Sequence, residues 1–295
     1  MNSPRYKAFI QSNNKQLIGA ELAKYSLISN SQHPADFDVE IMLVEKLPQM
    51  LKYEGQAYFK GKNSDKWTVN DLQSFTMTRF LPASLMNFQG KALVIDPDVF
   101  ATPGTDIMEL FEKDMKGKAI LACSADNNKF KSSVMLLDCE KLRAWSWDKD
   151  LEDVFSGKKD YRAWMNLQLE PNGSVGVLED EWNHCDTLTD KTKLIHYTRR
   201  VTQPWKTGLK VDFKYDIPTR YWYLPKVFLR WLKKIQGGNN IYHARYQQNP
   251  SIKQEDFFFN LLKKALEQGA LQESFIRQCV RDKHVRPDIL KKNQE

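Results

Sequence analysis

The sequence contains no long hydrophobic run and few cysteines. No stretch approaches the ~18 consecutive apolar residues that a membrane-spanning helix requires, and the polar start MNSPRYKAF has no apolar signal core. These absences predict a cytoplasmic protein. The four cysteines are widely separated and lack the paired spacing of zinc sites. We therefore expect buried, reduced thiols with no chemical role.

The sequence also has no internal repeat and no low-complexity tract. Hydrophobic residues make up 41% and charged residues 27% of the 295-residue chain, which excludes a disordered or fibrous protein. This length fits one large α/β domain with an appendage, and therefore one sizeable core.

Basic charge is concentrated in the C-terminal part of the chain. Residues 216–295 contain 15 Lys and Arg against 8 Asp and Glu, which accounts for the whole net charge of +7. Residues 1–215 are therefore formally neutral. The asymmetry suggests an anionic partner for the C-terminal part, such as nucleic acid, acidic lipid or a phosphorylated glycan. The alternative is a solvated basic face with no partner.

Short apolar runs alternate with amphipathic stretches along residues 1–215. The runs are bounded by turn residues, as buried parallel strands are, and they cover residues 6–11, 38–44, 91–95, 118–123 and 133–137. Helical spacing is clear in residues 17–28, and a short helix is expected over 105–113. The alternation predicts an α/β fold, with a mostly parallel central sheet flanked by helices and ligands bound where strands end.

Two carboxylates follow the predicted strand 91–95. Asp96 and Asp98 are separated by one residue in the sequence IDPD, so their side chains can converge on one cation. Divalent ions such as Mn²⁺ and Mg²⁺ prefer carboxylate oxygens and leave other positions for water and substrate phosphates. The alternative is an ordinary turn, because Asp is common in turns.

A histidine follows a second apolar run about a hundred residues later. His196 lies in KLIHYTRRVTQPWK, and an imidazole can complete a metal site begun by two carboxylates. The nearby cations Arg199, Arg200 and Lys206 could neutralise a diphosphate. The alternative is a structural, hydrogen-bonded histidine.

Taken together and in order, these motifs resemble the family-8 glycosyltransferases, which are retaining enzymes of the GT-A fold and include glycogenin and bacterial lipopolysaccharide galactosyltransferases. The likeness runs from about Tyr6 to Trp205. It comprises the first strand and its turn, TMTRFLP, IDPD, FKSSVMLLDCEKL at 130–142, the EWN element and LIHYTRRVTQPW. Bacterial glycosyltransferase-like proteins with VMLLDC and an HYT…TQPW ending resemble it most.

The resemblance implies a metal-dependent transfer of a hexose from a UDP-sugar to a hydroxyl of a glycan or glycoconjugate, with retention of configuration. It implies Mn²⁺ or Mg²⁺ on Asp96, Asp98 and His196, and places Asp98, Lys131 and Asn166 nearest the reaction. The donor would be held by a wider set of residues, namely Gln11, Ser12, Asn13, Arg79, Asp96, Ser132, Ser133, Trp182, Asn183, Arg199, Gln203 and Lys206.

The sequence departs from the family pattern at several positions. Where relatives carry a glycine and a lysine near the end of the motif, this chain has Arg199 and Gln203, so Arg199, Arg200 or Lys206 are the alternatives for the diphosphate contact. Asp160 and Asn166 in DYRAWMN stand only approximately for the usual Asp-Gln pair of the family. A lysine at 131, in place of the usual asparagine, suits a charged sugar or a phosphate.

The C-terminal extension, residues 216–295, mixes aromatic and basic side chains. In residues 221–234 this composition suits either peripheral contact with the inner face of the membrane or packing on the catalytic domain. A break is expected at 237–240, and a helix capped at Ser251 should end at Gly269.

Two rival functions remain open at the level of sequence. A nucleic-acid-associated protein would use the basic aromatic tail, but no nucleic-acid motif is present and we expect no such partner. A catalytically silent GT-A relative would keep the fold as a binding platform.

Overall fold

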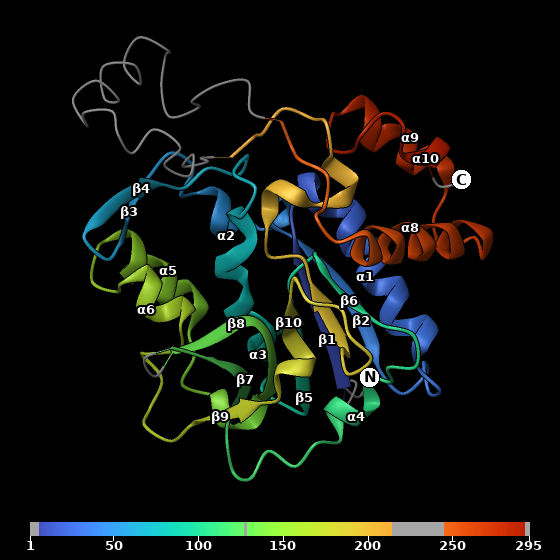
Figure 1. Cartoon of the computed structure of the whole chain (residues 1–295). Coiled ribbons are helices and arrows are strands. Elements are labelled where there is room, and N and C mark those ends of the chain that lie inside the picture. The colour runs from blue at the N-terminus through green and yellow to red at the C-terminus, as the bar shows by residue number, and fades with distance from the viewer. Residues whose placement is uncertain (1–5, 127–128, 214–244, 293–295) are drawn as a thin grey trace.

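A six-stranded sheet forms the centre of the protein. The computed structural model describes residues 6–126, 129–213 and 245–292 (Figure 1). The strand order is β2-β1-β5-β8-β7-β9. The bounds are β1 Tyr6–Ser12, β2 Asp38–Leu43, β5 Lys91–Ile95, β7 Ile120–Ala125, β8 Lys129–Asp138 and β9 Val175–Leu178.

The mostly parallel sheet predicted from the alternation is confirmed. β1 runs parallel to β2 and β5, and β7 runs parallel to β9. Only β8 is antiparallel to its neighbours, β5 and β7. Because β1 and β5 are parallel neighbours, their carboxyl ends meet at one edge of the sheet.

Helices cover both faces of the sheet, because strand side chains alternate between two cores. In β5, Leu93 and Ile95 enter one core while Ala92 and Val94 enter the other. The first core contains side chains of α1 Leu17–Asn30, α4 Met108–Phe111, α8 Ile252–Glu267, α9 Glu273–Arg281 and α10 Ile289–Lys292. The second contains those of α2 Pro48–Leu51, α3 Pro82–Leu85, α5 Trp147–Phe155 and α6 Tyr161–Met165.

Shorter elements join these layers. A three-stranded sheet consists of β10 His184–Cys185, β11 Leu194–His196 and β6 Val99–Ala101, and a hairpin of β3 Ala57–Lys60 and β4 Asn63–Lys66. The 3₁₀ turns are η1 Asn14–Gln16, η2 Val44–Lys46, η3 Ser74–Phe80, η4 Cys139–Leu142, η5 Asp180–Asn183, η6 Arg200–Thr202 and η7 Pro204–Lys206.

The predicted C-terminal helix is confirmed as α8. The Ser251 side chain caps its start by accepting from the Gln254 amide, and Gly269 follows its end with a φ of +69°. Phe258 of α8 stacks on Trp205 with ring centroids 4.9 Å apart. The described C-terminal helices therefore share a core with the sheet.

The predicted aromatic and basic element, residues 221–234, and the expected break at 237–240 lie outside the described residues. Among the residues that the structure does describe, no helix has both the length and the apolar character to span a membrane.

Gly19 of α1 lets this helix approach the IDPD turn. A Cβ at this position would lie 2.4 Å from the Pro97 carbonyl oxygen, between the two aspartates. We expect Gly19→Ala to lower the free energy of unfolding by about 1 to 3 kcal/mol and to weaken metal binding at the adjacent turn. Chemical unfolding and metal titration measure the two effects. Ser29→Ala, at an exposed position of the same helix, is the control, and equal behaviour of both variants would contradict the prediction.

Candidate metal centre

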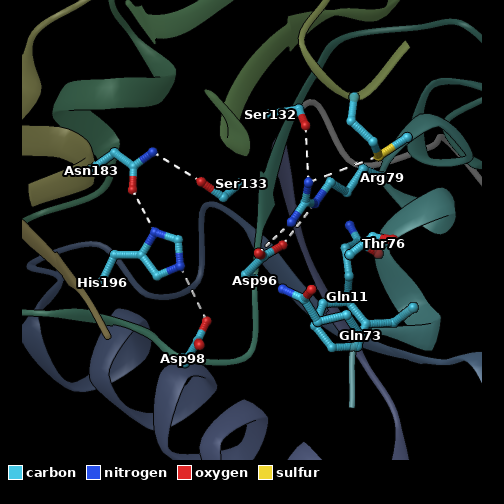
Figure 2. A network of polar contacts seen from close by, with 12 residues as sticks. Gln11, Gln73, Thr76, Arg79, Asp96, Asp98, Ser132, Ser133, Asn183 and His196 are labelled. Atoms are coloured by element: carbon cyan, nitrogen blue, oxygen red, sulfur yellow. Dashed lines mark hydrogen bonds and ion pairs between the residues drawn. The ribbon is translucent and has the colours of Figure 1, made fainter. Parts of the chain in front are cut away.

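Two aspartates of one turn and a histidine about a hundred residues later in the chain meet at the carboxyl end of β5. Ligand atoms of Asp96, Asp98 and His196 all lie within 4.8 Å of one another, and all three residues are buried (Figure 2). The sequence predicted this trio, and the structure brings it together.

Strand pairing places the histidine opposite the aspartates. β6 follows the IDPD turn and pairs antiparallel with β11, with His196 opposite Val99. The Tyr197 amide donates to the Asp98 carbonyl oxygen at 3.0 Å, which extends this pairing into the turn. The apolar residues of β11 fix the register because Leu194 and Ile195 are fully buried.

Asn183 orients the imidazole. Its side-chain nitrogen donates to the Ser133 hydroxyl at 3.1 Å, and its Oδ1 lies 2.8 Å from His196 Nδ1 (Figure 2). With Oδ1 as the acceptor, Nδ1 carries the proton, and Nε2 faces Asp98 Oδ1 at 3.3 Å. Such an outer hydrogen bond is the usual arrangement behind a histidine that ligates a metal.

The ionisation of His196 depends on these neighbours. Burial lowers the pKa of His196, but the negative charge and hydrogen bond of Asp98, with smaller contributions from Cys185 and Asp96, outweigh burial and raise the pKa to about 10. The histidine and Asp98 therefore form an ion pair when no metal is bound.

Arg79 in η3 donates two hydrogen bonds to the Asp96 carboxylate. Its Nε donates to Oδ1 at 2.9 Å and its Nη2 to Oδ2 at 2.5 Å, while Nη1 donates to the Ser132 hydroxyl at 3.0 Å. Burial lowers the pKa of Arg79, but Asp96 outweighs it and the guanidinium remains charged. Each oxygen of Asp96 keeps a lone pair, because a carboxylate has about four acceptor sites.

The donor set fits a hard divalent cation. Asp98 Oδ2 accepts a hydrogen bond from Gln203 Nε2 at 3.0 Å, whereas the buried Oδ1 has no polar neighbour among the described residues except His196 Nε2, at 3.3 Å. A buried carboxylate oxygen is costly unless a cation meets it, and a divalent ion at the trio would take the place of the imidazolium. Two carboxylates and an imidazole suit Mn²⁺ or Mg²⁺ and leave positions for a ligand.

Asn183→Ala tests the orienting role. We expect the variant to bind Mn²⁺ about 10- to 100-fold more weakly, because the imidazole loses its fixed direction. Titration calorimetry measures the change, with Asn172→Ala at an exposed position as the control. Unchanged affinity in Asn183→Ala would contradict the assigned role.

The trio opens into a cavity of about 290 Å³. Nine of its lining residues were candidates from the sequence, namely Arg79, Asp96, Asp98, Lys131, Ser132, Ser133, Asn166, His196 and Arg200. Others had no local signal and are brought there by the fold, among them Gln16, Gln73, Phe75, Phe130 and Thr198. A larger cavity of about 580 Å³, lined in part by Thr102 and Phe257, contains none of the trio.

Three of the residues expected to hold the donor, namely Gln11, Ser12 and Asn13, are not among the cavity lining and instead bond neighbouring residues. The Gln11 Oε1 accepts from Thr78 at 3.2 Å, the Ser12 hydroxyl donates to the Asn13 carbonyl at 3.1 Å, and the Asn13 side chain bonds Ser74 and caps η1. All three are fully buried.

The remaining candidates lie on other surfaces or in the core. Trp182 is a core residue with the Lys193 ammonium 4.6 Å from its ring. Arg199 has an exposed side chain near Asp186. Asp160, an approximate counterpart of a family residue, caps α6 and is occupied by that structural role.

The structure does not bring Lys206 to the 290 Å³ cavity. Its side chain is 1% exposed, donates to the His284 carbonyl at 3.3 Å and lies 5.5 Å from the Tyr246 ring. Of the three alternative cations for a diphosphate, only Arg200 lines the cavity.

The burial of Lys206 makes the free energy of unfolding depend on pH. Burial lowers its pKa to about 8, from 10.5 in the unfolded chain. Between these values the unfolded chain binds more protons, so this group raises the free energy of unfolding as the pH increases, by about 3 kcal/mol in full. We expect the stability of the unchanged chain relative to Lys206→Met to rise between pH 7.5 and pH 10 in urea unfolding. A difference independent of pH would contradict the prediction.

Comparisons with known proteins place this site in context. No protein-family model matches the sequence, and no curated protein matches it significantly. The fold is similar to apo-form glycosyltransferase GlyE of Streptococcus pneumoniae TIGR4, with 16% identity and a TM-score of 0.49 over 85% of this chain and 66% of that chain. The chain thus spans slightly less than two thirds of GlyE.

Two other solved structures are similar to this chain with comparably low sequence identities and TM-scores. The galactosyltransferase LgtC, in complex with donor and acceptor sugar analogues, shows 14% identity and a TM-score of 0.46 over 68% of this chain and 89% of that chain. Apo-form mouse xyloside xylosyltransferase 1 shows 14% identity and a TM-score of 0.41, with coverages of 66% and 98%. At such distances the assignment of an activity depends on the geometry of the site.

Proposed function

We propose that this protein is a metal-dependent glycosyltransferase that transfers a hexose from a UDP-sugar to an acceptor hydroxyl with retention of configuration. The observation that carries the proposal is the convergence of Asp96, Asp98 and His196 at a strand end, beside a cavity. The family-8 resemblance of the sequence and the similarity to glycosyltransferase folds agree with it.

In this proposal the side chains of the trio hold the ion and the surrounding donors hold the diphosphate. When bound, the divalent ion supplies Lewis-acid stabilisation of the departing diphosphate. Arg200 lines the same cavity and is available to neutralise phosphate, because among the described residues its guanidinium bonds only the neutral Gln73 side chain, at 3.2 Å, and lies 4.5 Å from the Phe213 ring. It replaces the lysine whose position is taken by Gln203.

The residues of β8 define the wall on which we place the sugar. Ser132 is fixed by Arg79 and Ser133 by Asn183, so both hydroxyls are held rigidly beside the trio. Rigid, preorganised polar groups of this kind position a substrate without reorganisation during the reaction. Asn166 lines the cavity nearby and is a further candidate for sugar contact.

Equilibrium binding of UDP with and without Mn²⁺ tests the proposal, followed by a panel of UDP-sugars assayed for Mn²⁺-dependent hydrolysis. We expect UDP to bind only in the presence of the ion, and one sugar to be hydrolysed fastest. UDP binding that is absent, or that does not depend on the ion, would contradict the proposal.

A catalytically silent binding protein is the second candidate, and the Gln203 amide on Asp98 favours it because this position lacks a charged donor for phosphate. Such a protein would bind UDP with the ion but hydrolyse no UDP-sugar. The same panel therefore separates the two functions.

A further inference from the structure

Lys131 is a cation in the cavity of the metal centre, and it forms no ion pair with any residue that the structure describes. It lies on β8, next to Ser132, and lines the cavity with the trio. Its ammonium contacts the Cys185 sulfur at 3.8 Å, a weak acceptor, and among the described residues it forms no ion pair. Of the other two cations that line the cavity, Arg79 is paired with Asp96, and Arg200 bonds the neutral Gln73 side chain.

When a metal ion and a diphosphate occupy the site, the positive charge of Lys131 is not offset by the other groups that line the cavity. Arg79 neutralises Asp96 through a two-pronged contact. The remaining negative charges are those of Asp98 and a bound diphosphate, and a divalent ion together with Arg200 offsets them. Lys131 then remains positive in a partly enclosed space, where unbalanced charge is unfavourable and an anion is attracted.

The position of Lys131 indicates which part of the ligand carries that anion. Arg79 bonds both Asp96 and Ser132, and Lys131 is the residue that precedes Ser132 on β8. Gln73 and Phe75 line the same cavity from a different segment, at the start of η3. A nucleotide-sugar whose diphosphate lies at the trio would extend its sugar along one wall and its nucleoside along the other.

We propose that Lys131 selects a donor whose sugar carries a carboxylate, such as a hexuronic acid. The inference rests on the proposed function and specifies its substrate class. An ammonium and a carboxylate form a charge-assisted hydrogen bond, which is stronger than the bond that a neutral hydroxymethyl group would make.

Titration calorimetry of the Mn²⁺-loaded protein tests the proposal with four probes, namely UDP-glucose, UDP-glucuronic acid, UDP-galactose and UDP-galacturonic acid. For at least one pair, the unchanged chain should bind the acidic donor about tenfold more tightly than the neutral one, given the usual strength of a charge-assisted hydrogen bond. Lys131→Met should remove this preference, and Lys131→Arg should keep it.

Lys129→Met is the matched control, since Lys129 begins the same strand and is not among the residues that line the cavity. The measured quantity is the ratio of acidic to neutral affinity within each variant, so a general loss of binding does not imitate the effect. Equal affinities in the unchanged chain, or a preference retained by Lys131→Met, would overturn the proposal. UDP alone tests the proposed function separately, because it lacks the sugar. Its failure to bind would contradict both.

Discussion

We expect Asp98→Asn to lower the rate of Mn²⁺-dependent UDP-sugar hydrolysis by about a thousandfold. The estimate follows from the loss of metal stabilisation of the leaving group, which supplies several kcal/mol, at about 1.4 kcal/mol per factor of ten. Asp98 Oδ1 has only His196 Nε2 as a polar neighbour among the described residues, so the substitution removes a ligand of the ion and leaves Gln203 facing a side-chain amide. Initial rates at saturating donor measure the change.

Folding must be separated from ligation in this experiment. Asp256→Asn is the matched control, because Asp256 is an exposed carboxylate on α8. Thermal melts of both variants should resemble that of the unchanged chain. If Asp98→Asn folds normally and retains more than about a tenth of the rate, a threshold of about 1.4 kcal/mol, the metal is not held as proposed.

We expect Arg79→Met to lower the free energy of unfolding by about 3 to 5 kcal/mol. The substitution leaves the Asp96 carboxylate buried without its cation, and breaking a buried pair from one side costs about this much. It also removes the donor to Ser132. Burial already acts to raise the pKa of Asp96, with Arg79 as the main opposing influence. Urea unfolding at neutral pH measures the loss.

Two companion variants identify the cause. Arg277→Met breaks an exposed ion pair with Glu273, so we expect it to change the free energy of unfolding by less than about 1 kcal/mol. In the double variant Arg79→Met with Asp96→Asn, the buried charge is absent and part of the lost stability should return. A double variant no more stable than Arg79→Met would show that the packing of the guanidinium, and not charge, accounts for the loss.

The sequence predicted the sheet well because buried strands leave a local pattern. β1, β2, β5 and the core of β8 are short apolar runs ended by turn residues, and each was located within a few residues. The helix α8 was also predicted, because the Ser251 cap and Gly269 are local signals. The helix expected over 105–113 is shorter, with α4 limited to Met108–Phe111. The hairpin β3 and β4 was missed, since its strands are short and mostly exposed and β4 consists only of polar residues.

The candidate site could be predicted where its residues follow strand ends. Asp96, Asp98 and His196 were found from motifs, and the structure places them together. The distinction between Arg200 and Lys206 could not be predicted, because both are basic residues near one motif. Folding turns Lys206 toward the C-terminal helices, at His284, and Arg200 toward Gln73. Such directions depend on tertiary packing.

The central claim is that Asp96, Asp98 and His196 bind one divalent cation. Anomalous scattering from a crystal grown with MnCl₂ and UDP tests it most directly. We predict a single manganese peak within about 2.5 Å of a carboxylate oxygen from each aspartate and of His196 Nε2, as direct ligation requires. A crystal with UDP bound in the cavity, no manganese at the trio and His196 Nε2 still donating to Asp98 would contradict the account.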